Sequence, residues 1–150
     1  MPPIESTIDI ACPADVVFAY ATDPTRFPEW QKDVVRVRLA AGRPSTVGST
    51  FTTTRWIGRT ERTTTQEITE VVPPRRWAAR GVDGPIRPSA SITVDELDGG
   101  STSRVTFTLD FEGHGIGVPL VPLVRRQAQK AAPGSYRNLK ERLESGATTG

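Results

Sequence analysis

The feature that most constrains the fold of this chain is a long amphipathic segment near its C-terminus, from about Gly117 to Ser145. Small and apolar residues recur there at steps of three and four, which places them on one side of an α-helix. They are Leu120, Val124, Ala128, Ala131, Ser135, Leu139 and Leu143. A helix of roughly 25 residues is about 38 Å long at 1.5 Å per residue. Because a stripe of that length needs a broad surface to pack against, the rest of the chain is expected to form a sheet.

Most of the preceding chain has the period of two that is typical of β-strands. The clearest example is 103–113, where apolar and polar residues alternate, and the other segments are 4–10, 34–39, 49–57, 60–72, 75–82 and 89–97. Turn signals at Gly58-Arg59 and Asp98-Gly99-Gly100 favour hairpins, so an antiparallel meander is predicted after the second strand. A loop is predicted at 41–48 and a frayed tail at 146–150.

Two short helices are predicted between the first and second strands. Pro13 and Asp15 favour a helix start at the segment 14–22, and Asp23-Pro24 favours a second start before 25–30. In the long helix, Pro133-Gly134 is expected to cause a kink or an interruption. The predicted fold is therefore α+β, with about seven strands in a curved antiparallel sheet that wraps round one long C-terminal helix.

Several phrases carry a resemblance to a known family. They are IDIACPADVVFAYATDPTRFPEW (8–30), VGSTF (47–51), ITEVVPPRRW (68–77), LDGGSTSRVTF (97–107) and NLKERLE (138–144). In this order they resemble the START-related superfamily, also called SRPBCC, in the branch of polyketide cyclases, dehydrases and lipid transport proteins. The resemblance implies the helix-grip fold of the birch pollen allergen, with a deep pocket for apolar small molecules. It implies no particular reaction.

Length and charge narrow the functional classes. The 150 residues suit a single domain, 1–150, and 36% hydrophobic with 24% charged residues fits a soluble globular protein. The net charge of +2 comes from scattered cations, so no nucleic-acid partner is expected. The sequence has no secretory signal and no apolar run that could span a membrane, which favours the cytoplasm. A homodimer is left open.

Chemistry that depends on a metal, a cofactor or a nucleophile has little support. Cys12 is the only cysteine and His114 the only histidine, so neither a zinc site nor a Ser-His triad is expected. The glycines after the last strand lack the lysine and the spacing of a phosphate loop, and no cofactor is expected. His114 is interpreted as an exposed or capping loop residue. No catalytic residue is predicted.

The ligand site is expected between the sheet and the long helix, where small helix residues leave space. Residues predicted to bind the ligand are Trp30, Phe51, Arg55, Trp77, Phe107, Phe111, Leu120, Val124, Gln127 and Tyr136. If Phe51 points inward, alternation also turns Arg55 inward, as a cation for an anionic or carbonyl-rich ligand. A slip of one residue would instead place Arg55 on the convex face, and both readings stay open.

Other residues are weaker candidates for the site. Arg80 and Gln66 are further inward candidates, and Trp56 is a candidate wall residue. The resemblance to polyketide cyclases, which use arginine and tyrosine to orient a poly-β-keto chain, implies the same role for Tyr20, Arg55 and Tyr136. Gln127 could bond a ligand or lie at the margin of the helix stripe in water.

Three functions are compatible with these observations. The first is binding of a hydrophobic or aromatic small molecule, lipid-like or polyketide-like, in the cavity. The second is a polyketide cyclase or dehydratase that acts there by orientation and acid–base groups. The third is a protein-interaction module, which predicts a collapsed interior.

Overall fold

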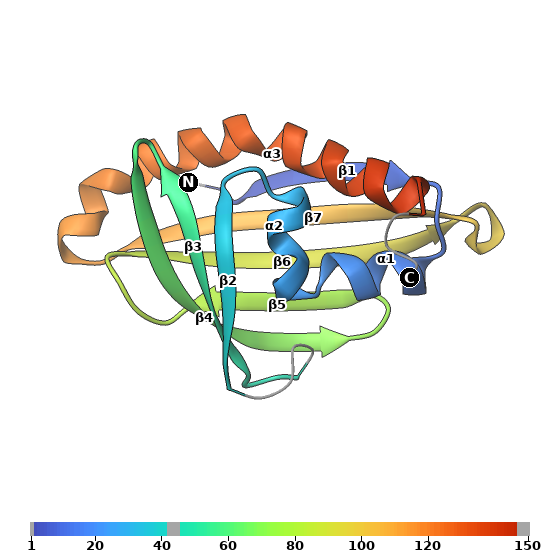
Figure 1. Cartoon of the computed structure of the whole chain (residues 1–150), viewed down its shortest axis with the longest axis horizontal. Helices are drawn as coiled ribbons and strands as arrows, with labels where there is room; N and C mark the ends of the chain where they lie inside the picture. The colour runs from blue at the N-terminus through green and yellow to red at the C-terminus, as the bar shows by residue number, and fades with distance from the viewer. Residues whose placement is uncertain (1, 42–45, 147–150) are drawn as a thin grey trace.

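The computed structural model describes residues 2–41 and 46–146 of the chain, so the predicted loop at 41–48 and tail at 146–150 lie largely outside the described residues. Within these ranges, seven strands form one antiparallel sheet in the order β1-β7-β6-β5-β4-β3-β2 (Figure 1). The strands are β1 (Ile4–Ile10), β2 (Val34–Ala41), β3 (Thr50–Ile57), β4 (Thr60–Val72), β5 (Arg76–Gly81), β6 (Ile86–Leu97) and β7 (Thr102–Gly113). The predicted meander from β2 to β7 is confirmed, and β1 adds to its far edge against β7.

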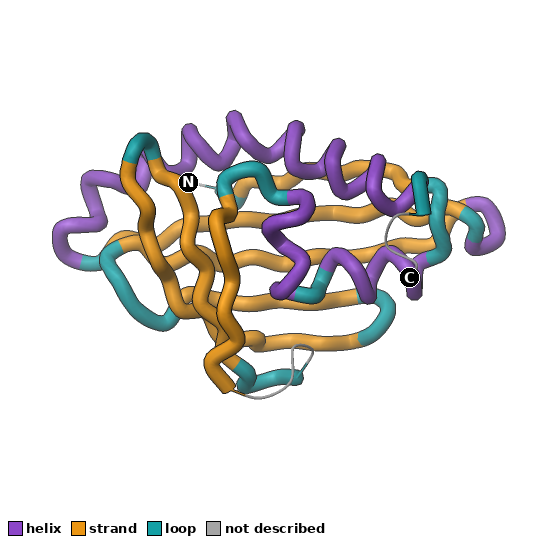
Figure 2. The backbone as a smooth tube through the Cα atoms, viewed as in Figure 1, coloured by secondary structure: helices purple, strands orange, loops and turns teal. Residues whose placement is uncertain are grey.

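The sheet is strongly bent. In Figures 1 and 2, β2 and β3 run across the direction of β5, β6 and β7, so the sheet curls towards the helices. Register shifts in the β2–β3 and β4–β5 pairs accompany this bend, since a bulge increases local twist. The inner face is therefore concave.

Two short helices follow β1, as predicted. Helix α1 spans Ala14–Ala21, and a 3-10 turn η1 (Pro24–Arg26) leads into α2 (Phe27–Trp30). The side chain of Asp23 accepts a hydrogen bond from the backbone N–H of Thr25 at 3.0 Å, which is the expected cap. These helices cover part of the concave face.

The long helix α3 spans Val121–Glu144 and follows a 3-10 segment η3 (Gly115–Leu120). Helix α3 continues through Pro133-Gly134, so the interruption that was one predicted outcome is absent. Pro133 lies on the exposed side, where solvent can satisfy the carbonyl that loses its N–H partner. Tertiary packing on the opposite side, through Leu139 and Leu143, stabilises the helix beyond this point. The predicted helix-grip fold is confirmed.

The core occupies one half of the space between sheet and helices. Phe27 lies at its centre, with its ring edge-on to Trp30, Phe51 and Trp77 at centroid distances of 5.8, 6.0 and 6.0 Å. Leu139 and Leu143 close this core from the C-terminal half of α3. The cavity lies mainly beneath the N-terminal half of α3 and extends to Ser135 and Tyr136, next to α2.

Candidate functional site

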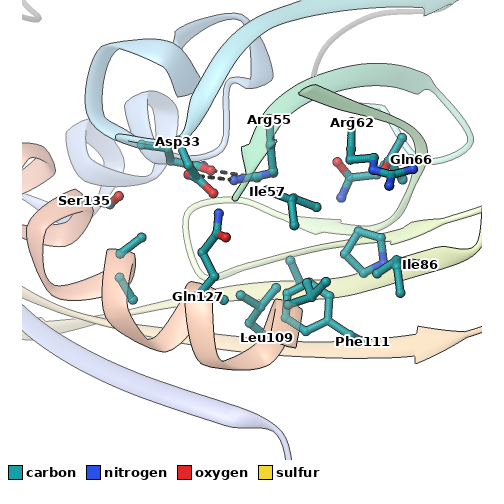
Figure 3. A pocket seen from close by; sticks show the side chains of 18 of the residues that line it. Asp33, Arg55, Ile57, Arg62, Gln66, Ile86, Leu109, Phe111, Gln127 and Ser135 are labelled. Carbon is teal, nitrogen blue, oxygen red and sulfur yellow. Dashed lines mark hydrogen bonds and ion pairs between the residues drawn. The ribbon is translucent and has the colours of Figure 1, made fainter. Parts of the chain in front are cut away.

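A cavity of about 630 Å³ lies between the concave face of the sheet and α3 (Figure 3). Its apolar wall comes from β6, β7, the end of η3 and the start of α3 and includes Ile86, Pro88, Ile92, Leu109, Phe111, Leu120, Leu123 and Val124. Its other side is formed by β3 and β4, including Ile57, Thr64 and Gln66. The interior is therefore not collapsed, in contrast to what the interaction-module hypothesis predicts.

Small side chains on α3 explain why this space is open. Ala128, Ala131 and Ala132 line the cavity from one face of the helix, at spacings of three and four residues. A methyl group reaches only a short way from the helix backbone, whereas a leucine or phenylalanine at these positions would fill the gap. The small and apolar face of α3 therefore packs tightly at Leu139 and Leu143, whereas it leaves space at its alanines.

A polar cluster stands at the end of the cavity near α2. The guanidinium of Arg55 donates from Nη1 to Oδ1 of Asp33 at 3.2 Å and from Nη2 to Oε1 of Gln31 at 2.8 Å (Figure 3). All three residues line the cavity, and the side chains of Arg55 and Asp33 are about a third and a quarter exposed, at 31% and 23%. The register thus places Arg55 on the concave side, but as one member of an ion pair.

Tyr136 lines the cavity beside this cluster. Its ring stacks on Phe107 at a centroid distance of 3.9 Å and an interplanar angle of 8°. Its hydroxyl has no hydrogen-bond partner among the described residues. Burial raises the pKa of Tyr136 further above neutrality, from 10 to about 12, and the protonated phenol can donate a hydrogen bond.

Two glutamines of the wall are already bonded within the protein. Oε1 of the buried Gln66 accepts from Thr53 Oγ1 at 3.1 Å, which leaves its amide N–H groups as donors. Gln127 joins α3 to the turn between β3 and β4. Its Oε1 accepts from the N–H of Gly58 and its Nε2 donates to the carbonyl of Trp56, each at 2.7 Å.

The structure brings nine of the ten predicted ligand-binding residues to the cavity wall. They are Trp30, Arg55, Trp77, Phe107, Phe111, Leu120, Val124, Gln127 and Tyr136. Phe51 is the exception and corrects the prediction. It points inward, as alternation requires, but it is fully buried in the aromatic core under Phe27 and Trp77.

Three weaker candidates lie away from the cavity. Tyr20 is buried beside α2, where its hydroxyl donates to Glu29 at 2.9 Å. Arg80 is exposed and pairs with Glu67 at 3.6 Å, because its position in β5 faces the convex side. Trp56 is 46% exposed rather than part of the wall, since it alternates with the inward Arg55. His114 precedes η3 and pairs with Glu112 at 3.1 Å.

Sequence reasoning missed Asp33 and Gln31. Both lie between α2 and β2, where no periodic pattern assigns a direction to a side chain. The signal that could have found Asp33 is the need of an inward arginine for a carboxylate partner. The sequence offers many carboxylates, however, and it does not reveal the register shift between Val34 and Arg36 that follows Asp33. It therefore does not single out Asp33 as the partner.

Within 2–41 and 46–146, no group of three or more His, Cys, Asp or Glu side chains gathers as a metal ion requires. None of the helices in the described residues is both long enough and apolar enough to span a bilayer.

Comparisons with known proteins agree with this geometry. A family model described as polyketide cyclase / dehydrase and lipid transport matches residues 1–144. A search of curated proteins finds no match. Among solved structures, the Zhui aromatase/cyclase from Streptomyces sp. R1128 matches with a TM-score of 0.82 and 15% identity, over 97% of this chain and 94% of that chain.

Two further structures extend the comparison. A START superfamily protein from Mycobacterium smegmatis matches with a TM-score of 0.78 and 16% identity, over 97% of this chain and 99% of that chain. The di-domain aromatase/cyclase BexL from the BE-7585A biosynthetic pathway matches with a TM-score of 0.74 and 16% identity. It covers 98% of this chain, which spans only 48% of BexL. At such identities the likeness shows the fold alone.

Proposed function

Because the chain belongs to the polyketide cyclase/dehydrase and lipid transport family, we propose that it binds a hydrophobic or aromatic small molecule in the cavity between the sheet and α3. The observation that carries this proposal is the cavity itself. Its 630 Å³ falls within the range of roughly 300–1,000 Å³ that is typical of small-molecule sites. A largely apolar wall with one polar cluster suits a ligand that is apolar over most of its surface.

The wall residues have different roles in this proposal. Phe107, Phe111 and the aliphatic residues of α3 contact the apolar body of the ligand, and burial of that surface supplies most of the affinity. Trp30 and Trp77 close the end of the cavity that adjoins the core. Arg55 and Tyr136 are the proposed donors to a polar atom of the ligand, and they fix its orientation.

Fluorescence offers a direct test, because the buried Trp30 and Trp77 line the cavity. We expect 2-acetylnaphthalene to change the tryptophan emission in a saturable way. Ala131→Phe places a ring in the cavity and should weaken binding by at least about tenfold, which is 1.4 kcal/mol. Gln129→Phe adds the same ring at an exposed position of α3 and serves as the control.

Equal binding by wild type and Ala131→Phe would show that the cavity is not the site. If Ala131→Phe does not fold, the smaller change Ala128→Leu gives the same comparison, with a reduced loss of affinity expected. A thermal unfolding curve for each variant distinguishes lost binding from lost structure.

A second candidate function, cyclisation or dehydration of a polyketide-like substrate, is favoured by one observation. Asp33 and the protonated Tyr136 line the same cavity, next to the guanidinium of Arg55. In this proposal, Tyr136 and Arg55 donate to a substrate carbonyl, and the carboxylate of Asp33 accepts a proton from the neighbouring carbon. The wall would hold the chain folded and exclude water.

Product analysis separates the two candidates. A carrier leaves the product distribution of a reactive poly-β-keto compound unchanged, whereas a cyclase changes it. A cytoplasmic location, a homodimer and the lack of a nucleic-acid partner stay predictions from the sequence.

A further inference from the structure

We propose that Asp33 makes the cavity selective for uncharged ligands that carry a hydrogen-bond acceptor such as a ketone, and that it excludes carboxylates of the same shape. This inference rests on the proposed binding function and specifies its ligand class. Its basis is the ion pair between Asp33 and Arg55, which cancels the cation that an anionic ligand would need.

Four charged side chains line the cavity in the described part of the chain: Asp33, Arg55, Glu61 and Arg62. Their formal charges sum to zero. Glu61 and Arg62 are exposed residues of β4 at the rim of the cavity, where solvent screens their charges. The balance of charge at the polar end is therefore set by Asp33 and Arg55, which are 3.2 Å apart.

A carboxylate that reached the guanidinium would bring a second anion close to Asp33. The two carboxylates would repel each other across a partly buried space, and the ligand would also lose its hydration. A ketone oxygen meets neither cost, because it is uncharged and accepts the same hydrogen bonds. The pair of Asp33 with Arg55 thus penalises anions more than neutral acceptors.

Several N–H and O–H groups at this end lack a partner in the described part of the chain and can donate to a ligand, beside the second carboxylate oxygen of Asp33. The guanidinium has five N–H groups, and the bonds to Asp33 and Gln31 use two of them. The hydroxyl of Tyr136 has no partner among the described residues. A ligand with an acceptor at one end matches this set better than a pure hydrocarbon.

Three matched ligands test the inference at neutral pH: 2-acetylnaphthalene, 2-naphthoate and 2-ethylnaphthalene. They share one ring system and differ at one end. For wild type we expect the ketone to bind at least about tenfold more tightly than the carboxylate and several-fold more tightly than the hydrocarbon.

Asp33→Asn keeps the size of the side chain and removes its charge. We expect the affinity ratio of carboxylate to ketone to rise by about tenfold or more, because Arg55 becomes an unpaired cation. Asp95→Asn makes the same charge change at an exposed position of β6 outside the cavity and should leave the ratio unchanged.

Wild-type binding of the carboxylate as tight as that of the ketone would overturn the inference, as would an unchanged ratio in Asp33→Asn. Failure of all three ligands to bind would instead contradict the proposed function itself. If Asp33→Asn does not fold, Arg55→Gln decides the matter, because the preference for ketone over hydrocarbon should then fall while the carboxylate stays excluded. A gain of carboxylate affinity in Arg55→Gln would contradict the proposal.

Discussion

The side-chain oxygen of Gln127 accepts a hydrogen bond from the backbone N–H of Gly58 at 2.7 Å, so α3 is tied to the turn between β3 and β4. The same side chain donates to the carbonyl of Trp56. These contacts lie beside Ile57 and Thr60, which line the cavity. One side chain therefore holds together two elements that face each other across the site.

Gln127→Ala should speed up ligand exchange. It removes both hydrogen bonds, each worth about 1 kcal/mol, and the turn can then separate more often from the helix. We expect the dissociation rate of 2-acetylnaphthalene to rise roughly five- to thirtyfold, measured by stopped-flow fluorescence. Gln129→Ala, at an exposed position of α3, is the control. Equal rates for the two variants would show that the bonds of Gln127 do not limit release.

Arg125 should contribute to stability rather than to binding. It is buried, and its guanidinium donates to Asp110 at 2.7 Å and to the carbonyl of Pro2 at 2.6 Å, which ties α3 to β7 and to the N-terminal segment. We expect Arg125→Ala to lower the free energy of unfolding by about 2–3 kcal/mol. The neighbouring Arg126 is exposed, so Arg126→Ala should change the free energy of unfolding by less than about 0.5 kcal/mol. Urea unfolding curves of the two variants measure this difference, and equal losses of unfolding free energy would contradict the structural role of Arg125.

Two glycines should respond in opposite ways to alanine. At Gly117, a Cβ would lie 1.8 Å from the carbonyl oxygen of Pro85, so Gly117→Ala must displace η3 and should cost at least about 2 kcal/mol. At Gly134, the nearest atoms belong to the exposed, flexible end of the Lys32 side chain, at 2.8 Å.

Since alanine has the higher helix propensity, Gly134→Ala should stabilise the protein by up to about 1 kcal/mol. Melting temperatures order the variants, and a destabilised Gly134→Ala would show that Lys32 cannot move aside.

High pH should destabilise the fold partly through Tyr136. Burial raises its pKa to about 12, whereas an unfolded tyrosine ionises near 10. The folded state therefore holds this proton more tightly, and the resulting stability is complete below about pH 10 and lost between about pH 10 and 12. Tyr136→Phe should show a shallower fall in unfolding free energy over that range, by about 2 kcal/mol. Identical pH slopes would contradict the assignment.

Periodicity predicted the architecture well, because each strand and the long helix have one buried face. The alternation in β7 and the three- and four-residue steps of α3 indicate which side chains face the interior. Burial of these side chains supplies most of the stability of the fold. Of the two outcomes predicted for Pro133-Gly134, a kink or an interruption, the interruption does not occur, since packing on the other face offsets the local cost of proline.

The site was harder to predict than the fold. Alternation states that Phe51 and Arg55 point inward, but it does not distinguish the core from the cavity. That distinction depends on α2, whose Phe27 covers Phe51 and leaves Arg55 uncovered. The partner of Arg55 depends on how the chain leaves α2 for β2, and this path is set by tertiary contacts rather than by a sequence pattern.

The alanines of α3 give the cavity an adjustable size. Ala128, Ala131 and Ala132 border the open space yet contribute little to the packed cluster around Phe27. Replacement of any of these alanines by a larger residue would reduce the cavity volume, while the strands kept their register. Related proteins could thus acquire different ligand lengths through changes on a single helical face, with the curved sheet retained as an invariant frame.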